Sequence, residues 1–139
     1  TADLYRALKI LPDDLDLYES ADGRNKSSAN SLRRIARNFG LDYNRDNKLL
    51  ISKLCKKLIS IQLNNLYLTI NKIFSKNSFF SKTTPIILCG IGKNIIKFDK
   101  QKYNFINFED LLHVNSTKNI YASYHAPATS CALLISELK

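Results

Sequence analysis

Apolar side chains recur at helical spacing through the long middle segment of the chain. Between Asp46 and Lys76 the apolar positions lie three to five residues apart, as on one face of an α-helix. The positions that define this stripe are Leu50, Leu54, Leu58, Ile61, Leu66, Ile70 and Ile73, and those that broaden it are Leu49, Ile51 and Ile59. The pattern predicts a helix over 46–76, roughly 45 Å long, with a break near Asn64 and Asn65 as an alternative. Such a helix would cover a sheet or a partner subunit, and it is compatible with a homodimer interface.

Shorter apolar patterns predict further helices near both ends of the chain. The expected segments are 1–8, 29–39 and the last part of 121–138. Ser27 or Ser28 can cap the second of these helices, and Gly40 suits the residue that follows its end. Pro127 fits the first turn of the last helix, where a missing N–H costs nothing. The apolar positions expected to be buried in that helix are Ala132, Leu133, Ile135 and Leu138.

A short apolar run that ends in two glycines lies between these helices. Residues 86–89 form an apolar run with the length of a short strand, and all four are apolar, so the strand could be buried on both faces. Gly90 and Gly92 would let a ligand approach the backbone closely. A helix that opens at Lys93 would offer its free N–H groups to an anion. The segment therefore predicts a strand and glycine turn over 85–93, although plain turn chemistry explains the same residues.

A second strand is predicted at 103–108, where aromatic residues or isoleucine alternate with asparagine. Two short strands do not form an independent sheet. The fold class expected is therefore α/β and helix-rich, with the remaining strands supplied from elsewhere. The chain also contains no methionine. Together these features predict that 1–139 is a single partial domain, the carboxy-terminal part of a larger protein.

The charge of the chain is strongly positive, and it narrows the range of partners. A net charge of +9 suits an anionic partner. The lysines are scattered, however, and no zinc-finger spacing, ribonucleoprotein-type aromatic motif or heptad with a basic region accompanies them, so nucleic acid is not expected. No apolar run reaches the roughly 18 residues of a membrane span, and the first residues do not resemble a signal peptide. We therefore expect a cytoplasmic protein without a membrane partner.

Three cysteines, Cys55, Cys89 and Cys131, are widely spaced and form no C-x-x-C pair. This spacing argues against a disulfide framework or a zinc site and fits a reducing compartment. Each cysteine has apolar neighbours, so we expect all three to be small buried hydrophobic residues.

Arginines are the strongest candidates for ligand binding. Arg33, Arg34 and Arg37 are expected on the surface of the 29–39 helix, away from its apolar stripe. Arg34 and Arg37 are three residues apart and can point the same way as Arg24. Together they could hold a phosphate or a carboxylate, although a solvated face is the simpler explanation for Arg33. His125 has no fixed partner in the sequence and is a weak catalytic candidate.

Five short segments, in this order, carry a resemblance to a known family. They are Thr1-Ala-Asp-Leu-Tyr-Arg, Ser20-Ala21-Asp22-Gly23-Arg24, Ser31-Leu32-Arg33-Arg34-Ile35-Ala36-Arg37 with Gly40 and Asp42, Gly90-Ile91-Gly92, and Ala126-Pro127-Ala128. With these segments the chain resembles the carboxy-terminal portion of the hydantoinase/oxoprolinase-related proteins of tetrahydromethanopterin-linked one-carbon metabolism, the methanofuran-biosynthesis synthase family.

The resemblance implies a fold and an activity. The fold would be the carboxy-terminal lobe of an actin-like ATPase/sugar-kinase (ribonuclease H-like) protein, with Gly90, Ile91, Gly92 and Lys93 on the adenosine side of a nucleotide such as ATP. The activity would be a transferase reaction that forms an aryl alkyl ether. In it, the phenol of γ-glutamyltyramine displaces pyrophosphate from an aminomethylfuran diphosphate.

Such a reaction needs cations on the leaving diphosphate and a base or charge partner for the phenol. The residues that the resemblance offers for the diphosphate are Arg24, Lys26, Arg34 and Arg37, together with Mg²⁺. Asp3 and Asp22 are the candidates for the general base, and Asp22 is the candidate metal ligand.

The chain also departs from the superfamily pattern. The phosphate loops of the superfamily, an Asp-x-Gly and a Gly-Ser/Thr-Thr-Thr-Asp segment, are not found in it, and its four glycines do not reproduce them. The chain alone is therefore expected to be inactive and to work with the N-terminal half of the same enzyme. The alternative is a non-catalytic nucleotide-binding or regulatory module of the same superfamily.

Overall fold

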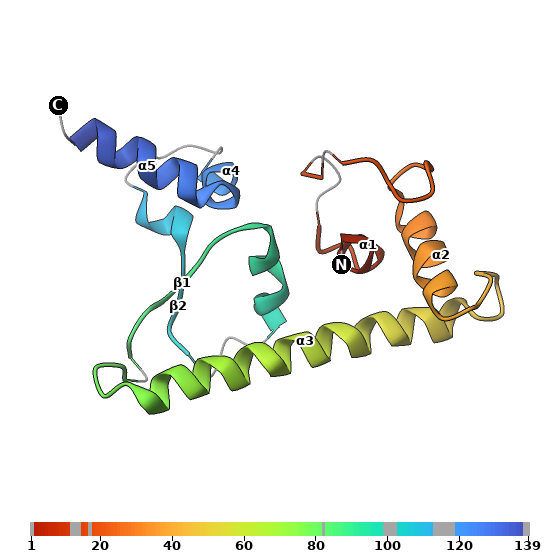
Figure 1. Cartoon of the computed structure of the whole chain (residues 1–139), viewed down its shortest axis with the longest axis horizontal. Helices are drawn as coiled ribbons and strands as arrows, with labels where there is room; N and C mark the ends of the chain where they lie inside the picture. The colour runs from red at the N-terminus through yellow and green to blue at the C-terminus, as the bar shows by residue number, and fades with distance from the viewer. Residues whose placement is uncertain are drawn as a thin grey trace. The chain divides into compact units, whose positions relative to one another are not determined.

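The computed structural model of the protein describes residues 2–11, 15–16, 18–81, 83–98, 103–112 and 119–137. The chain divides into two compact units, unit 1 (Thr1–Lys72) and unit 2 (Ile73–Lys139). The described residues are mostly helical and include one small parallel sheet, as expected for a helix-rich α/β chain (Figure 1). No helix in the described ranges is long and apolar enough to cross a membrane.

Unit 1 is built from three helices, α1 (Ala2–Ala7), α2 (Ser28–Asn38) and the part of α3 (Lys48–Lys76) that precedes Ile73. Its core joins α2 to α3. The fully or nearly fully buried members are Leu32, Ile35, Ala36, Ile51 and Cys55. The residues packed around them include Leu4 and Ala7 of α1 and Leu8, which follows it. Helix α1 therefore packs against the same core. Cys55 is buried, which confirms the prediction for that cysteine.

Local signals in the sequence fix the ends of α2. The Ser27 side chain accepts a hydrogen bond from the N–H of Asn30 at 3.3 Å, as an N-cap residue does. Beyond the C-terminal end, Gly40 has φ +68°, a left-handed conformation that favours glycine. Both boundary residues had been predicted from the sequence, and the structure confirms them.

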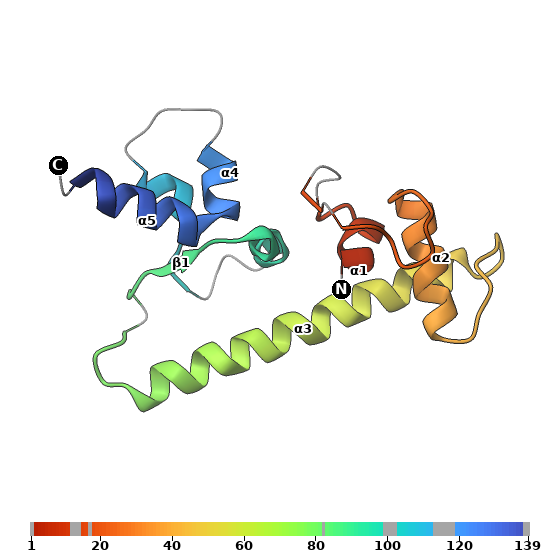
Figure 2. The ribbon, with the colours of Figure 1, turned by 45° about the horizontal axis from the view of Figure 1, so that its top comes forward.

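Helix α3 is continuous from Lys48 to Lys76, so the break considered near Asn64 and Asn65 does not occur (Figure 2). The predicted stripe, however, is only partly the buried one. Ile51 and Ile59, which broaden the predicted stripe, are buried together with Cys55. The positions of the predicted stripe that are instead exposed are Leu50, Leu58, Ile61 and Ile73. The helix carries apolar side chains around most of its circumference, so spacing alone does not identify the side that faces the core.

Unit 2 contains a two-stranded parallel sheet of β1 (Ile86–Leu88) and β2 (Phe105–Asn107). Ile86 pairs with Phe105, and Leu88 pairs with Asn107. Its remaining described elements are the 3₁₀ helices η1 (Ile91–Phe98) and η2 (Phe108–Leu111) and the α-helices α4 (Asn119–Tyr124) and α5 (Ala126–Glu137). Both predicted strands are present, and Pro127 lies in the first turn of α5 as expected.

Burial in unit 2 differs from the expectation in three places. Ile87 is 51% exposed, so β1 is not buried on both faces, because a sheet of two short strands is not covered on its second side. Cys89 and Cys131 are exposed rather than buried. In α5 the predicted buried positions Leu133 and Ile135 are exposed, and Ala132 is too, while Leu138 lies outside the described residues. The 3₁₀ helix also begins at Ile91 rather than at Lys93.

Candidate functional site

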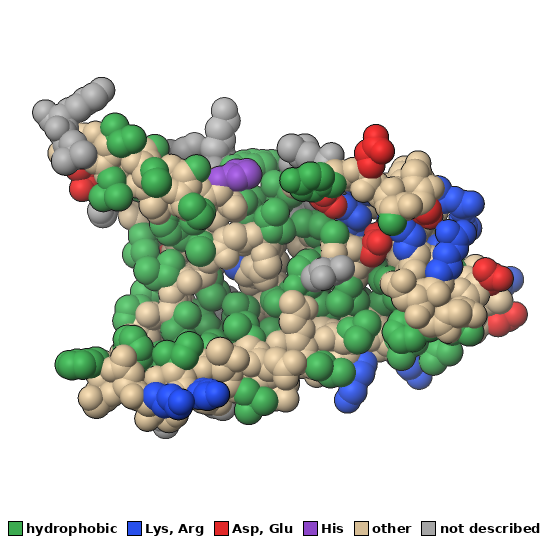
Figure 3. Space-filling model, viewed as in Figure 1, with side chains coloured by type: hydrophobic (Ala, Val, Ile, Leu, Met, Phe, Trp, Pro, Cys, Tyr) green, Lys and Arg blue, Asp and Glu red, His purple; other side chains and the backbone are tan. Residues whose placement is uncertain are grey.

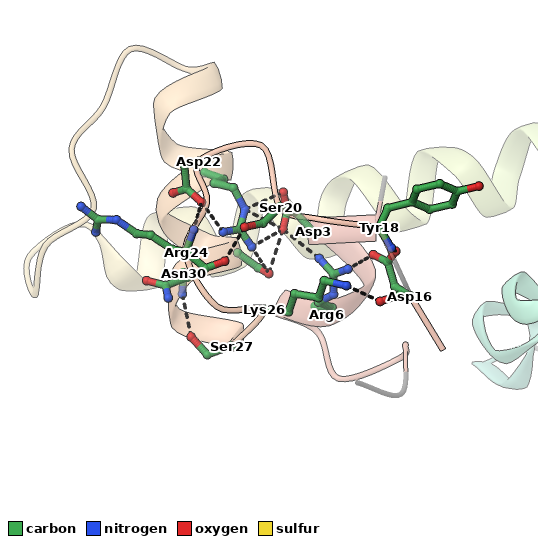
Figure 4. A network of polar contacts seen from close by, with 12 residues as sticks. Asp3, Arg6, Asp16, Tyr18, Ser20, Asp22, Arg24, Lys26, Ser27 and Asn30 are labelled. Atoms are coloured by element: carbon green, nitrogen blue, oxygen red, sulfur yellow. Dashed lines mark hydrogen bonds and ion pairs between the residues drawn. The ribbon is translucent and has the colours of Figure 1, made fainter. Parts of the chain in front are cut away.

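Arg34 of α2 is the centre of a polar cluster in unit 1. Its Nε donates to both carboxylate oxygens of Asp3 at 2.9 Å, and its Nη2 donates to Asp3 Oδ1 at 2.7 Å. Its Nη1 donates to Asp22 Oδ1 at 2.8 Å (Figure 4). One guanidinium thus links α1, the turn at Asp22 and α2. The prediction that Arg34 lies on the surface is wrong: its side chain is only 7% exposed, because two carboxylates satisfy its donors.

Three residues that the sequence did not single out, Ser31, Arg6 and Asp16, complete this cluster. Ser31 is fully buried, donates to Asp3 Oδ1 at 2.9 Å and accepts from Arg34 Nη2 at 3.2 Å. Arg6 is also buried; its Nη1 lies 3.3 Å from Asp3 Oδ1, and its Nη2 pairs with Asp16. The available signal was the three-residue spacing of Asp3 and Arg6 and of Ser31 and Arg34, which places each pair on one helix face. We name Asp3, Arg6, Asp16, Asp22, Ser31 and Arg34 the Arg34 cluster.

Predicted cations border the Arg34 cluster on its exposed side. The side chain of Arg37 is 50% exposed, and its Nη1 lies 3.7 Å from Asp22 Oδ2. Arg24 is exposed, and its backbone N–H donates to Asp22 Oδ1 at 3.3 Å. The ammonium of Lys26 donates to the backbone carbonyl of Asp16. Basic and acidic side chains gather over the part of unit 1 that contains α2 (Figure 3). The structure therefore brings every predicted unit 1 site residue together, with Arg34 inside and Arg24 and Arg37 outside.

The electrostatics of the cluster keep both aspartates ionised. Partial burial alone would raise the pKa of Asp3, but hydrogen bonds from Arg34 and Ser31 outweigh this and lower the pKa below 3.8. The pKa of Asp22 is also lowered, since Arg34 and the Arg24 backbone N–H outweigh its desolvation. Hydrogen bonds to Asp3 in turn raise the pKa of Arg34. A carboxylate with a lowered pKa is a weak base. Both aspartates are therefore better suited to binding arginines than to acting as a general base.

The stability of unit 1 is expected to fall in acid through Asp3. A carboxyl group with a lowered pKa in the folded state stabilises the fold above its unfolded pKa, near 3.8, and this contribution is lost as the pH falls through the folded value. Urea unfolding followed by circular dichroism between pH 7 and pH 3 should therefore show a smaller difference between wild type and Asp3→Asn below about pH 4. Asp42→Asn, at an exposed position, is the control. A constant difference at every pH would contradict this role for Asp3.

The surroundings of Asp22 do not fit a resident Mg²⁺ ion. Both oxygens of Asp22 face arginine groups, from Arg34, Arg37 and the Arg24 backbone. Positive neighbours disfavour a second cation on the same carboxylate. Within the described ranges, no group of three or more His, Cys, Asp or Glu side chains gathers in a way that could hold a metal.

The predicted glycine turn lies in unit 2 and is held by α4. Gly90 has φ +79°, and its N–H donates to the Ser123 carbonyl at 2.9 Å. Lys93 is buried; its Nζ donates to Ser123 Oγ at 2.9 Å, pairs with Glu109 and lies 5.6 Å from the centre of the Tyr124 ring. Burial would raise the pKa of Glu109, but hydrogen bonds from Lys93 and Ser123 outweigh this and lower it, so the Glu109 carboxylate is ionised.

A pocket of about 320 Å³ adjoins this turn within unit 2. Its lining residues are Leu88, Lys93, Ile96, Tyr103, Asn104, Phe105 and Asn107. Among the predicted turn residues, Lys93 lines the pocket, whereas Gly90, Ile91 and Gly92 do not. His125 is exposed and is not part of the lining.

Comparison with known proteins adds no assignment, because no family model and no curated protein matches the chain. The geometry of the Arg34 cluster and of the unit 2 pocket is therefore what bears on function.

Proposed function

We propose that this chain is the carboxy-terminal part of a methanofuran-biosynthesis synthase, within the second lobe of an actin-like ATPase/sugar-kinase fold. The convergence of three sequence segments supports this proposal. Asp3, Asp22 and Arg34 come from the three separate segments of unit 1 that resemble the family, and they meet through hydrogen bonds of 2.7–2.9 Å. Asp3 and Arg34 are 31 residues apart in the sequence. Segments that share a site are expected to converge in this way, whereas unrelated turn and helix signals are not.

The reaction would join two small molecules in the cytoplasm. The phenol oxygen of γ-glutamyltyramine forms a bond to the methylene carbon of the aminomethylfuran diphosphate, and the bond from that carbon to the diphosphate oxygen breaks. Pyrophosphate leaves with the bonding electrons, and the phenol proton passes to water. Arg24 and Arg37 are the exposed cations suited to the charge that develops on the leaving group. Mg²⁺ would enter the site bound to the oxygens of the diphosphate substrate.

The Arg34 cluster would set the position of the Arg37 guanidinium. Asp22 lies between buried Arg34 and exposed Arg37, at 2.8 Å and 3.7 Å. An arginine held by a fixed carboxylate loses less side-chain freedom when it binds a phosphate, so the site is preorganised. The N-terminal half of the enzyme would supply the phosphate loops of the superfamily, along with any use of ATP.

A reconstitution experiment tests this function. The chain is mixed with a polypeptide that carries the phosphate loops, with both substrates and Mg²⁺, and ether product and pyrophosphate are measured by mass spectrometry and a coupled assay. We expect both products in equal amounts from the mixture and neither from the chain alone. Absence of the ether from a mixture in which the two polypeptides bind each other would contradict the synthase function and favour a non-catalytic regulatory module.

A further inference from the structure

Helix α3 carries an exposed apolar stripe beside the side that faces the core of unit 1. Leu50, Leu58 and Ile61 are 51%, 38% and 47% exposed. Leu54 lies between them in sequence and is partly buried against the core. These four positions are three or four residues apart, so they share one face of the helix. A regular stripe of exposed Leu and Ile over about 17 Å of helix is typical of a surface that binds another helix.

The charge of α3 has one sign only. The helix contains six lysines and no Asp or Glu. Lys53 and Lys57 are exposed and border the stripe, since Lys53 is three residues after Leu50 and Lys57 is four residues before Ile61. Hydrophobic and lysine side chains both lie at the surface over α3 (Figure 3). An apolar stripe bordered by lysines is complementary to an apolar stripe bordered by carboxylates.

A second copy of this chain does not supply that complement through α3. Two such stripes in contact would bring Lys53 and Lys57 of one copy toward those of the other, and α3 has no carboxylate to pair with them. Like charges across an interface disfavour association. The net charge of +9 adds a general repulsion between copies. These charges therefore favour a partner that is acidic and different from this chain.

An anionic membrane would attract the lysines, but it does not suit the rest of this face. Asn65 is exposed, four residues after Ile61 and three before Leu68, so its side-chain amide lies on the same face as the stripe. Insertion of the stripe among acyl chains would remove water from that amide and offer no hydrogen-bond partner in return. A protein surface can satisfy both the donors and the acceptor of an asparagine side chain. The polar interruption therefore favours a protein over a lipid surface.

We propose that the exposed stripe of α3 is a docking surface for an acidic amphipathic helix of a partner protein. Apolar side chains of that helix pack on Leu50, Leu58 and Ile61. Its carboxylates pair with Lys53 and Lys57. The surface shares no residue with the Arg34 cluster, and the proposal does not depend on the synthase function.

Binding of a synthetic peptide to the whole 139-residue chain tests this surface. The probe is a fluorescein-labelled helical peptide of about 18 residues, long enough to span the stripe, with a stripe of leucines bordered by glutamates. The comparison peptide has lysine in place of every glutamate. Fluorescence anisotropy should show saturable binding of the acidic peptide that is about tenfold tighter or more than binding of the lysine peptide. The affinity should fall as the salt concentration rises.

A pair of matched variants locates the apolar part of the surface. Ile61→Asp places a charge in the stripe and should weaken binding of the acidic peptide by about tenfold or more, equivalent to about 1.4 kcal/mol. Leu134→Asp introduces the same charge at an exposed apolar position of α5 and should leave the affinity unchanged. Circular dichroism verifies that both variants are folded.

A second pair of variants tests the lysines without a change to the apolar stripe, and it applies even if Ile61→Asp fails to fold. Lys53→Glu with Lys57→Glu should weaken binding of the acidic peptide by about tenfold. Arg45→Glu with Lys48→Glu is the control, because it makes an equal change of charge at exposed positions outside the stripe. It should alter the affinity by less than about threefold.

No saturable binding of the acidic peptide by the folded wild-type chain would overturn the proposal. So would equal binding of the two peptides, or equal losses in a variant and its control. A dimer in analytical ultracentrifugation that Ile61→Asp abolishes would overturn it in favour of a second copy. Binding to phosphatidylserine vesicles that Ile61→Asp abolishes, without binding of the peptide, would overturn it in favour of a membrane.

Discussion

Replacing Arg34 by alanine is expected to destabilise unit 1 more than any other single change to its polar residues. The guanidinium holds Asp3 through Nε and Nη2 and Asp22 through Nη1, and its own side chain is only 7% exposed. Removal of one partner from a buried ion pair leaves the other charged and poorly solvated. The Arg34–Asp3 pair is partly accessible, so we expect a loss of about 2–3 kcal/mol, below the range for fully buried pairs.

Urea unfolding of the Arg34→Ala chain, followed by circular dichroism, measures this loss. Arg33→Ala is a matched control, because Arg33 is the neighbouring arginine on the same helix and no ion pair is described for it. It should change the free energy of unfolding by less than about 0.5 kcal/mol. Arg34→Lys should resemble Arg34→Ala, since lysine keeps the charge but does not form the forked contacts. Equal unfolding midpoints for Arg33→Ala and Arg34→Ala would contradict a structural role for Arg34.

The sequence predicted the helices of unit 1 well because their signals are local. Ser27 at the start of α2 and Gly40 after its end act on their own backbone neighbours. The residues of a short segment are therefore enough to predict where the helix begins and ends. The buried side of α3 was predicted less well. Leu50 and Ile51 are adjacent and equally apolar, yet Leu50 is 51% exposed and Ile51 is fully buried. Only packing against α2 distinguishes them. The spacing of apolar residues along α3 does not predict which side of the helix packs against α2.

The candidate site was predicted in its members but not in its arrangement. The sequence grouped Arg24, Arg34 and Arg37 as three equivalent surface cations. In the structure, Arg34 is occupied by Asp3 and Asp22, whereas Arg37 is half exposed. The partners of Arg34 lie 31 and 12 residues away, so the difference depends on how the chain folds back on itself. The burial of Lys93 with Glu109 and Ser123 was missed for the same reason, with separations of 16 and 30 residues.

The double variant Arg24→Ala with Arg37→Ala is expected to keep the fold of unit 1 and to lose most of the proposed synthase activity. Both side chains are exposed, so their removal leaves no buried charge without a partner. In the proposed synthase, each would meet charge on the leaving diphosphate. Loss of one such donor commonly costs on the order of 100-fold in rate. We therefore expect turnover in the reconstituted mixture to fall by roughly 100-fold or more, equivalent to about 2.7 kcal/mol.

Pyrophosphate release under saturating substrates measures this effect, and unfolding in urea verifies that the variant is folded. Arg45→Ala with Lys48→Ala removes the same charge from exposed positions that the Arg34 cluster does not touch. That control should retain turnover within about threefold, or ~0.7 kcal/mol. The comparison separates a local site from the general attraction of a chain with a net charge of +9 for an anion. If both double variants lose the same turnover, the arginines beside Asp22 act only through net charge, and the diphosphate site must lie elsewhere.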